Sequence, residues 1–229
     1  MVVTHLTDPD ELWQDIVSDI PAGSGLYGLG VKDPYTLFHS YATSRLAFGL
    51  CCRNSLSYDN TALTARAALL HDVGKGMIPD PILKKDGPLT AEQSKVMQGH
   101  ARAGFDHLRS IGLEGEAMVA ITVHEQSRKN PYPRSRYDGS RWSDYGQIVS
   151  VADMFSALWD DRAYKKPVRN TEMIGNMISD DLSCDSKLVE QVLEEHERLL
   201  SGSARFRPSS VLESPYRSCP QHQGRYRSR

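Results

Sequence analysis

Apolar residues recur at helical spacing along most of the chain, and the two-residue alternation of half-buried strands is scarce. The helical pattern covers residues 10–20, 34–54, 61–74, 90–111, 116–125, 147–159, 171–178 and 185–200. Thr90 and Gln93 match a capping box at the start of the fourth of these segments. The pattern predicts an all-α protein.

Three segments depart from the helical pattern. Pro21 and the glycine-rich "AGSGLYGLG" that follows are expected to break the chain. Residues 126–145 are rich in Pro, Arg and Ser without periodicity, which predicts a loop of about 20 residues. Unstructured loops of that length are uncommon in compact domains, and they are usually functional or disordered. We therefore expect an N-terminal helical and loop extension (1–30), one helical domain (31–200) and a disordered tail (201–229).

Composition narrows the class of protein. Hydrophobic residues make up 39% and charged residues 24%, as in globular domains, and no apolar run approaches the ~20 residues that span a bilayer. The tail from residue 201 carries six arginines against one glutamate, so its charge is +5, while the remaining 21 basic and 28 acidic residues give −7. An acidic body argues against a DNA partner and is compatible with carboxylates that hold cations. Four cysteines without a CxxC pair indicate neither a zinc ribbon nor a disulfide framework, which favours a cytoplasmic location.

The strongest local signal is "LLHDVGKGMIPDPIL". His71 and Asp72 are adjacent at the end of a predicted helix, and Gly74 is a natural helix stop. Imidazole and carboxylate together suit Mn, Fe or Zn, and one carboxylate can bridge two ions. Lys75 follows closely enough to bind a substrate phosphate. The plain alternative is a capped surface helix with a hydrogen-bonded histidine.

Four further candidate ligands each fall on a different predicted helix: His39, His100, His124 and Asp153. Taken singly, a helical histidine is more often an ordinary one, and a helical aspartate is more often solvated. A helix bundle can nevertheless direct all of them inward, as bundles with metal sites do. The set is therefore a stronger indication of a metal site than any one member.

The segments "HDVGKGMIPDPILKKDGPLTAEQSKVMQGHARAG", "VHEQ…PYP" and "IVSVADMFSALWDDRAYKK" closely resemble the HD-GYP family of the HD phosphohydrolase superfamily. The resemblance covers roughly residues 39–178 and rests on specific motifs. It implies an all-α HD-domain bundle with a long loop between the fifth and sixth core helices. It also implies a metal-dependent phosphodiesterase that hydrolyses cyclic di-GMP to the linear dinucleotide, and onward to GMP, through a metal-activated hydroxide.

Carried over by position, the resemblance implies six metal ligands: His39, His71, Asp72, His100, His124 and Asp153. They would hold two divalent ions. Iron or manganese is the leading expectation for both ions, and zinc is the alternative. One of the two ions would be bound more weakly, by fewer protein ligands. Asp72 would bridge the ions and, with Lys75, would be catalytic. The implied phosphate contacts are Lys75, Arg162 and Lys165, and the implied base or ribose contact is Tyr132.

Several positions depart from the family pattern. Val123 replaces the first histidine of a His-His-Glu sequence, Tyr35 replaces a glutamate that supports a third metal in some members, and Ser156 replaces a second aspartate. Residues 128–133 keep only the Tyr-Pro of the family signature. Two alternatives follow: a module that binds a nucleotide or a signalling partner without turnover, or a hydrolase of another phosphate ester.

The predicted loop 126–145 combines cations with aromatic rings. The basic residues are Arg128, Lys129, Arg134, Arg136 and Arg141, and the aromatic ones are Tyr132, Tyr137, Trp142 and Tyr145. Cations beside stackable rings suit a dinucleotide. The resemblance implies docking on GGDEF-type cyclase domains as a competing use, and a solvated connector is the plain alternative.

Overall fold

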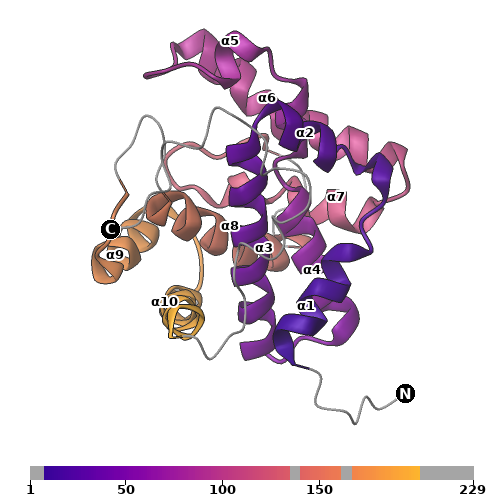
Figure 1. Ribbon diagram of the computed structural model, residues 1–229. Coiled ribbons are helices and arrows are strands. Elements are labelled where there is room, and N and C mark those ends of the chain that lie inside the picture. Colours follow the sequence, from indigo (N-terminus) through magenta and orange to yellow (C-terminus); the bar gives the residue numbers. More distant parts are fainter. Residues whose placement is uncertain (1–7, 135–139, 161–166, 202–229) are drawn as a thin grey trace, which may run out of the picture.

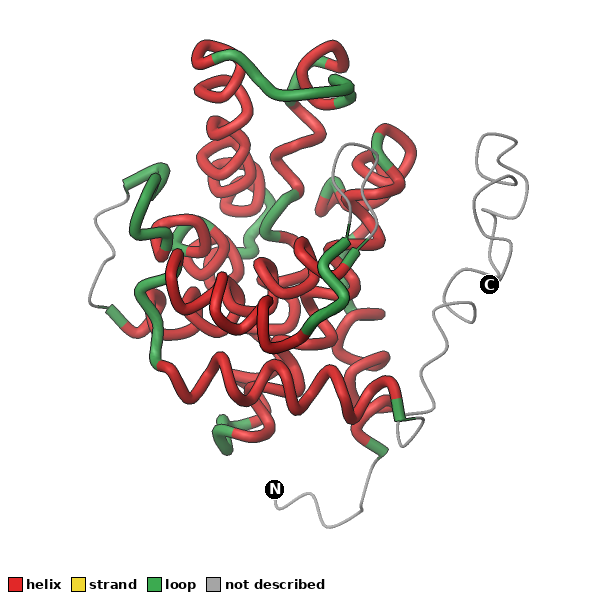
Figure 2. Tube along the Cα trace, turned by 90° about the vertical axis from the view of Figure 1, so that its left-hand side faces the viewer, coloured by secondary structure: helices red, strands yellow, loops and turns green. Residues whose placement is uncertain are grey.

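The computed structural model describes residues 8–134, 140–160 and 167–201, and all regular elements in this part of the chain are helical (Figure 1, Figure 2). The α-helices are α1 (Pro9–Ser18), α2 (Leu26–Lys32), α3 (Pro34–Arg53), α4 (Tyr58–Leu70), α5 (Asp80–Leu83), α6 (Ala91–Ser110), α7 (Glu114–Ala120), α8 (Arg141–Trp159), α9 (Thr171–Asp181) and α10 (Ser186–Leu200). Three short 3₁₀ helices are η1 (Ala22–Ser24), η2 (Val73–Met77) and η3 (Val123–Gln126). The all-α prediction is confirmed.

Helix α3 lies at the centre and packs against α4, α8 and α10 (Figure 1). Leu46 and Leu50 of α3 share one hydrophobic cluster with Val149 and Phe155 of α8. A second cluster joins the end of α4 to α6 and α7 through Leu70, among others. The two clusters place the end of α4 between α3, α6 and α8, where the candidate ligands lie.

Helix α6 begins as its sequence predicts. The Thr90 hydroxyl accepts a hydrogen bond from the Gln93 amide at 3.2 Å, and the Gln93 side chain accepts one from the Thr90 amide at 3.0 Å. This capping box satisfies two amides that would otherwise lack partners at the helix start. The prediction for this helix is confirmed.

The expected break after Pro21 was partly wrong, because residues 26–32 form α2. Two glycines weaken the local helical preference of this segment, but Leu26 and Leu29 are buried against the core. The ammonium of Lys32 donates to the carbonyls of Gly76 and Ile78, at 2.8 and 2.5 Å. Tertiary contacts therefore stabilise a helix that the sequence pattern alone does not predict.

The predicted loop 126–145 is shorter than expected, because α8 begins at Arg141. Trp142 and Tyr145 are partly buried residues of α8 that pack against the hydrophobic core, so they do not belong to a loop. Arg136 and Tyr137 lie outside the described residues. The tail beyond residue 201 also lies outside them.

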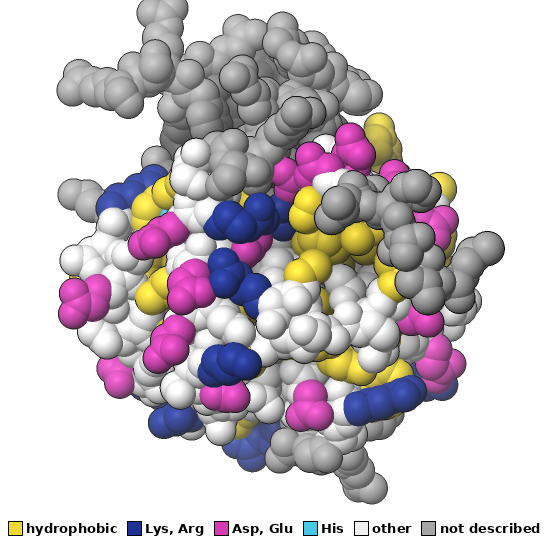
Figure 3. All heavy atoms as spheres, turned by 90° about the horizontal axis from the view of Figure 1, so that it is seen from below, with side chains coloured by type: hydrophobic (Ala, Val, Ile, Leu, Met, Phe, Trp, Pro, Cys, Tyr) yellow, Lys and Arg dark blue, Asp and Glu magenta, His cyan; other side chains and the backbone are white. Residues whose placement is uncertain are grey.

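The surface seen from below in Figure 3 mixes the two signs of charge. Basic and acidic side chains are interspersed across the coloured part of this face, beside apolar areas. Among the described residues, no helix is both long and apolar enough to cross a bilayer.

Candidate metal centre

The structure brings all six predicted ligands together. His39 comes from α3, His100 from α6, His124 from η3 and Asp153 from α8. His71 and Asp72 follow directly after α4. His39, His71, Asp72 and His100 are buried, whereas His124 and Asp153 are partly accessible. Residues separated by more than 100 positions thus meet at one point, where two of the six side chains remain partly accessible to solvent.

The orientation of His71 is set by its own helix. Its Nδ1 donates to the carbonyl of Ala68, 2.7 Å away, within the last turn of α4. Its Nε2 therefore faces two carboxylates, at 3.4 Å from Asp72 Oδ2 and 3.6 Å from Asp153 Oδ1. A histidine whose Nδ1–H is held by a carbonyl presents the Nε2 lone pair, as metal-ligating histidines do.

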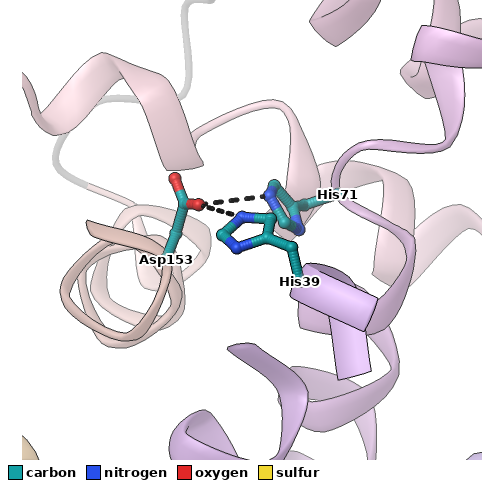
Figure 4. Close-up of side chains that lie close together, drawn as sticks. All are labelled: His39, His71 and Asp153. Atoms are coloured by element: carbon teal, nitrogen blue, oxygen red, sulfur yellow. Dashed lines mark hydrogen bonds and ion pairs between the residues drawn. The ribbon is translucent and has the colours of Figure 1, made fainter. Parts of the chain in front are cut away.

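One possible cation site is formed by His39, His71 and Asp153, whose donor atoms lie within 4.8 Å of one another. Figure 4 shows the Asp153 carboxylate directed at both imidazoles. Asp153 Oδ1 lies 2.7 Å from His39 Nε2 and 3.6 Å from His71 Nε2. This site joins α3, α8 and the end of α4.

A second possible site is formed by His71, Asp72 and His124, again within 4.8 Å. His100 adjoins it: its Nε2 is 3.2 Å from Asp72 Oδ1 and 3.2 Å from His124 Nε2. The Nδ1 of His100 lies 2.7 Å from the carbonyl of Met97 and donates to it. The Nε2 of His100 therefore points at a carboxylate oxygen and at a second imidazole nitrogen, contacts that a proton or a cation in between would satisfy.

Two buried atoms of this cluster, His71 Nε2 and Asp72 Oδ1, lack a well-oriented hydrogen bond, although polar atoms lie 3.2–3.6 Å from them. Buried polar atoms are almost always satisfied, so two such atoms at one point call for a ligand. Imidazole nitrogens and carboxylate oxygens are donors that suit manganese, iron or zinc. The residues present therefore fit divalent cations.

The charges of the cluster also favour cation binding. Burial alone would lower the pKa of His71, but the charges of Asp72 and Asp153 outweigh it and raise that pKa to about 9. Burial would raise the pKa of Asp72, yet its positive neighbours, first of all His71, hold it well below its usual range. Burial and the nearby His100 lower the pKa of His124 to about 3. The Asp72 carboxylate is thus charged and His124 neutral, which are the forms that bind metals. His71 carries a proton at neutral pH in the metal-free protein, and a bound cation would displace that proton from Nε2.

Two of the four predicted substrate contacts, Lys75 and Tyr132, lie beside the metal centre. The Lys75 ammonium lies 2.5 Å from Asp72 Oδ2 and remains partly accessible. The ring of Tyr132 stacks on His124, with centroids 4.8 Å apart and planes 15° from parallel. Arg162 and Lys165 lie outside the described residues.

The departures from the family pattern have structural consequences that the sequence does not reveal. The Ser156 hydroxyl lies 3.2 Å from His39 Nδ1 and 2.8 Å from the Thr43 hydroxyl. Val123 is 1% exposed and packs in the hydrophobic core, so the side chain that replaces a histidine contributes to packing. Tyr35 lies parallel to His39, with ring centroids 6.4 Å apart. The role of Ser156 has no local sequence signal, because its partner lies more than 100 residues away.

The fold and the cluster define an all-helical domain with a buried His/Asp centre suited to divalent cations. The chain belongs to the HD domain family, whose model matches residues 36–158. The resemblance noted from the motifs is confirmed.

Named relatives agree with this assignment. A cyclic di-GMP phosphodiesterase of Thermotoga maritima is 42% identical over 104 residues, which cover 44% of this chain and 28% of the relative. A 3′3′-cGAMP-specific phosphodiesterase of Vibrio cholerae is 31% identical over 150 residues, or 64% of this chain and 28% of the relative. The chain thus spans less than a third of either relative.

A solved structure shares the fold. The HD domain of the Listeria monocytogenes phosphodiesterase PgpH, in complex with cyclic-di-AMP, superposes with a TM-score of 0.59 at 20% identity. The match covers 80% of this chain and 98% of that domain. At this identity the likeness concerns the fold alone.

Proposed function

We propose that this protein is a metal-dependent phosphodiesterase that hydrolyses cyclic di-GMP to the linear dinucleotide, and onward to GMP. The observation that carries the proposal is the buried convergence of nitrogen and oxygen donors around two atoms that lack a well-oriented hydrogen bond, His71 Nε2 and Asp72 Oδ1. Relatives named for the hydrolysis of cyclic di-GMP and 3′3′-cGAMP support a cyclic dinucleotide. Both of these molecules contain guanine.

Six residues would hold two cations. His39, His71, Asp72 and Asp153 would bind the first, and Asp72, His100 and His124 the second, although His71 is close enough to contribute to either. Bound there, divalent ions would offset charge on the phosphoryl oxygens and lower the pKa of a water molecule. We propose iron or manganese, with zinc as the alternative, and a weaker second site because it has fewer protein donors.

The chain's own residues supply the rest of the proposed chemistry. The ammonium of Lys75 lies beside Asp72 at the accessible edge of the centre, where it can offset the charge of a substrate phosphate. Tyr132 covers one face of His124 and limits the access of water from that side. Burial raises the pKa of Tyr132, so its hydroxyl stays neutral and can act as a hydrogen-bond donor.

The test combines metal analysis with an assay. The purified protein is loaded with Mn²⁺ or Fe²⁺, metal per chain is measured, and turnover of cyclic di-GMP is followed beside an Asp72→Ala control. We expect up to two ions per chain and a turnover that the control loses. Full metal occupancy with no turnover of any cyclic dinucleotide contradicts the proposal. Nucleotide binding shared by the wild type and Asp72→Ala, with hydrolysis by neither, identifies a binding module instead.

Several sequence-based expectations stay predictions. These are the division into an extension (1–30), a phosphohydrolase domain (31–200) and a basic tail (201–229), the cytoplasmic location, and docking of the 126–145 segment on a GGDEF-type cyclase or other signalling protein. A truncation to residues 31–200 that keeps metal binding and turnover would support the proposed division.

A further inference from the structure

A pocket of about 350 Å³ adjoins the metal centre and is not explained by metal binding. Its lining comes from η3 and the residues after it, from α8, and from Asp181 and Leu182 at the end of α9, and it includes His124 and Asp153. The pocket therefore begins at two candidate metal ligands, His124 and Asp153, and extends to the end of α9. A substrate whose phosphate lies at the metals can place another of its groups there.

The lining of this pocket suits a flat heterocycle. Met154, Ala157 and Leu158 of α8, with Leu182, provide apolar walls, whereas Ser127, Asn130 and Asp181 provide polar groups. Apolar walls with a few polar groups are typical of small-molecule sites, which range from roughly 300 to 1,000 Å³. A volume at the lower end of that range matches one base with its ribose rather than a whole cyclic dinucleotide.

Asp181 is held in a fixed position relative to the metal centre. Its carbonyl accepts a hydrogen bond from the Arg128 amide at 2.6 Å, and the Ser183 amide donates to the Gln126 carbonyl at 2.8 Å. These backbone bonds join the end of α9 to the residues that follow η3, the element that carries His124. The distance from Asp181 to the candidate ligands is thus set by the backbone.

The Asp181 carboxylate retains capacity for further hydrogen bonds. Its Oδ2 accepts from the Ser127 hydroxyl at 3.3 Å, and its Oδ1 lies 3.6 Å from the ammonium of Lys129, whose side chain is 72% exposed. An ionised carboxylate accepts about four hydrogen bonds, so acceptor positions remain. A carboxylate in the last turn of α9 is also disfavoured by the helix dipole, so helix stability does not account for this residue.

We propose that Asp181 is a specificity-determining residue that selects guanine over adenine in this pocket, an inference that rests on the proposed function. The Watson–Crick edge of guanine presents two adjacent donors, N1–H and the 2-amino group, and a carboxylate can accept from both. Adenine presents an acceptor at N1, which a carboxylate repels. The pairing is charge-assisted, and hydrogen bonds to charged groups contribute about 1.5–3 kcal/mol each.

The test compares two bases in the same metal-loaded protein. The ratio of kcat/KM for cyclic di-GMP to that for cyclic di-AMP is measured in the wild type, in Asp181→Ala and in the isosteric Asp181→Asn. Asp180→Ala is the matched control, because Asp180 is the preceding residue of the same helix, is exposed and does not line the pocket. We expect both Asp181 variants to lower the ratio at least about tenfold, and the control to leave it unchanged. Metal content and Tm are expected to remain at wild-type values.

Equilibrium binding of GMP and AMP separates this inference from the proposed function. One outcome is that the wild type prefers GMP, that Asp181→Ala loses this preference, and that no cyclic dinucleotide is hydrolysed. In that case the role of Asp181 stands while the proposed activity fails. If cyclic di-GMP is hydrolysed, but the kcat/KM ratio and the preference for GMP over AMP are the same in the wild type and the Asp181 variants, the role of Asp181 is overturned while the activity stands. A loss of metal from the Asp181 variants also overturns it, because the residue would then be structural.

Discussion

The two nitrogens of the His39 ring have different partners. Nε2 lies 2.7 Å from Asp153 Oδ1, and Nδ1 lies 3.2 Å from the Ser156 hydroxyl, which the Thr43 hydroxyl contacts at 2.8 Å. Ligating histidines usually direct their other nitrogen to a hydrogen-bond acceptor that fixes the tautomer and the ring orientation. Ser156 is therefore suited to be a positioning residue for His39.

We predict that Ser156→Ala weakens metal binding without unfolding the protein. Losing the partner of a ligating histidine typically costs 10–100-fold in metal affinity, and one lost hydrogen bond costs about 1 kcal/mol of stability. Titration of the metal-free protein with Mn²⁺ by calorimetry measures the effect. Ser40→Ala is a suitable control, because Ser40 is buried next to His39 and its hydroxyl has no partner. Equal Mn²⁺ affinity in the Ser156→Ala variant and the wild type would contradict the prediction.

At the scale of elements, Gly74 allows η2 to pack directly against α6. A Cβ atom at this position would lie 2.0 Å from the carbonyl oxygen of His100 and 2.5 Å from the amide nitrogen of Gly104. Both neighbours are backbone atoms of a helix, so they cannot move aside as a side chain can. The glycine of the motif is therefore required by this close approach. Its predicted role as a helix stop is wrong, because α4 already ends at Leu70 and Gly74 lies within η2.

Gly74→Ala is expected to destabilise the protein and to displace His100 from the metal centre. Overpacking of a well-packed site costs typically 1–3 kcal/mol, and urea unfolding measures this loss, while metal analysis reports the second site. Gly76→Ala provides the matched control within η2, because a Cβ atom there would meet nothing within 4 Å. If the two variants had the same unfolding midpoint, the close approach would have no energetic importance.

The sequence predicts best the elements and ligands that have local signals. The capping box at Thr90 and the periodic pattern of α3 identify their helices, and the His-Asp motif with three histidines on other helices identifies the cluster. Helix α2 was missed because its stability comes from burial and from the contacts of Lys32. The sequence marks Ser156 only as a departure from the family pattern and does not mark Asp181 at all, because the contacts of each depend on partners on other elements.

At the scale of the whole molecule, one buried arginine links both ends of the described chain to the centre. Arg45 of α3, 1% exposed, contacts the carboxylate of Asp10 on α1 and lies 3.5 Å from Glu195 of α10. The aromatic rings of Trp13 and Phe48 flank its guanidinium at 5.9 and 5.4 Å. This contact places α1 and α10 against the helix that carries His39.

Arg45→Ala is expected to be strongly destabilising. It leaves the buried Asp10 carboxylate without the cation it contacts, whereas Glu195 keeps Arg53 and Arg198 as partners. Breaking a buried ion pair from one side costs about 3–5 kcal/mol. Arg102→Ala is the comparison, since Arg102 pairs with Asp106 on the exposed face of α6 and such pairs contribute about 0.3–0.5 kcal/mol. Guanidinium unfolding curves of the two variants test the difference, and similar midpoints would refute it.

The metal centre lies where the two main hydrophobic clusters meet. Leu70, next to His71, belongs to one cluster, whereas Val123, next to His124, and Phe155, two residues after Asp153, belong to the other. Each cluster packs through its own apolar contacts, so we expect the metal-free protein to remain folded. A cation bound by donors from both sides would stabilise their junction.

We therefore predict that chelation lowers the Tm without abolishing the cooperative transition. A ligand present at 100 times its Kd stabilises the folded state by about 2.7 kcal/mol, and for a chain of this size 1 kcal/mol corresponds to roughly 2–4 °C. Adding Mn²⁺ to the chelated protein should accordingly raise the Tm by about 5–10 °C, as calorimetry can measure. Asp72→Ala should lose this shift because it lacks the carboxylate between the two groups of donors. An equal shift in Asp72→Ala would mean that the stabilising cation binds elsewhere, and no shift in the wild type would mean that the cluster does not bind the ion.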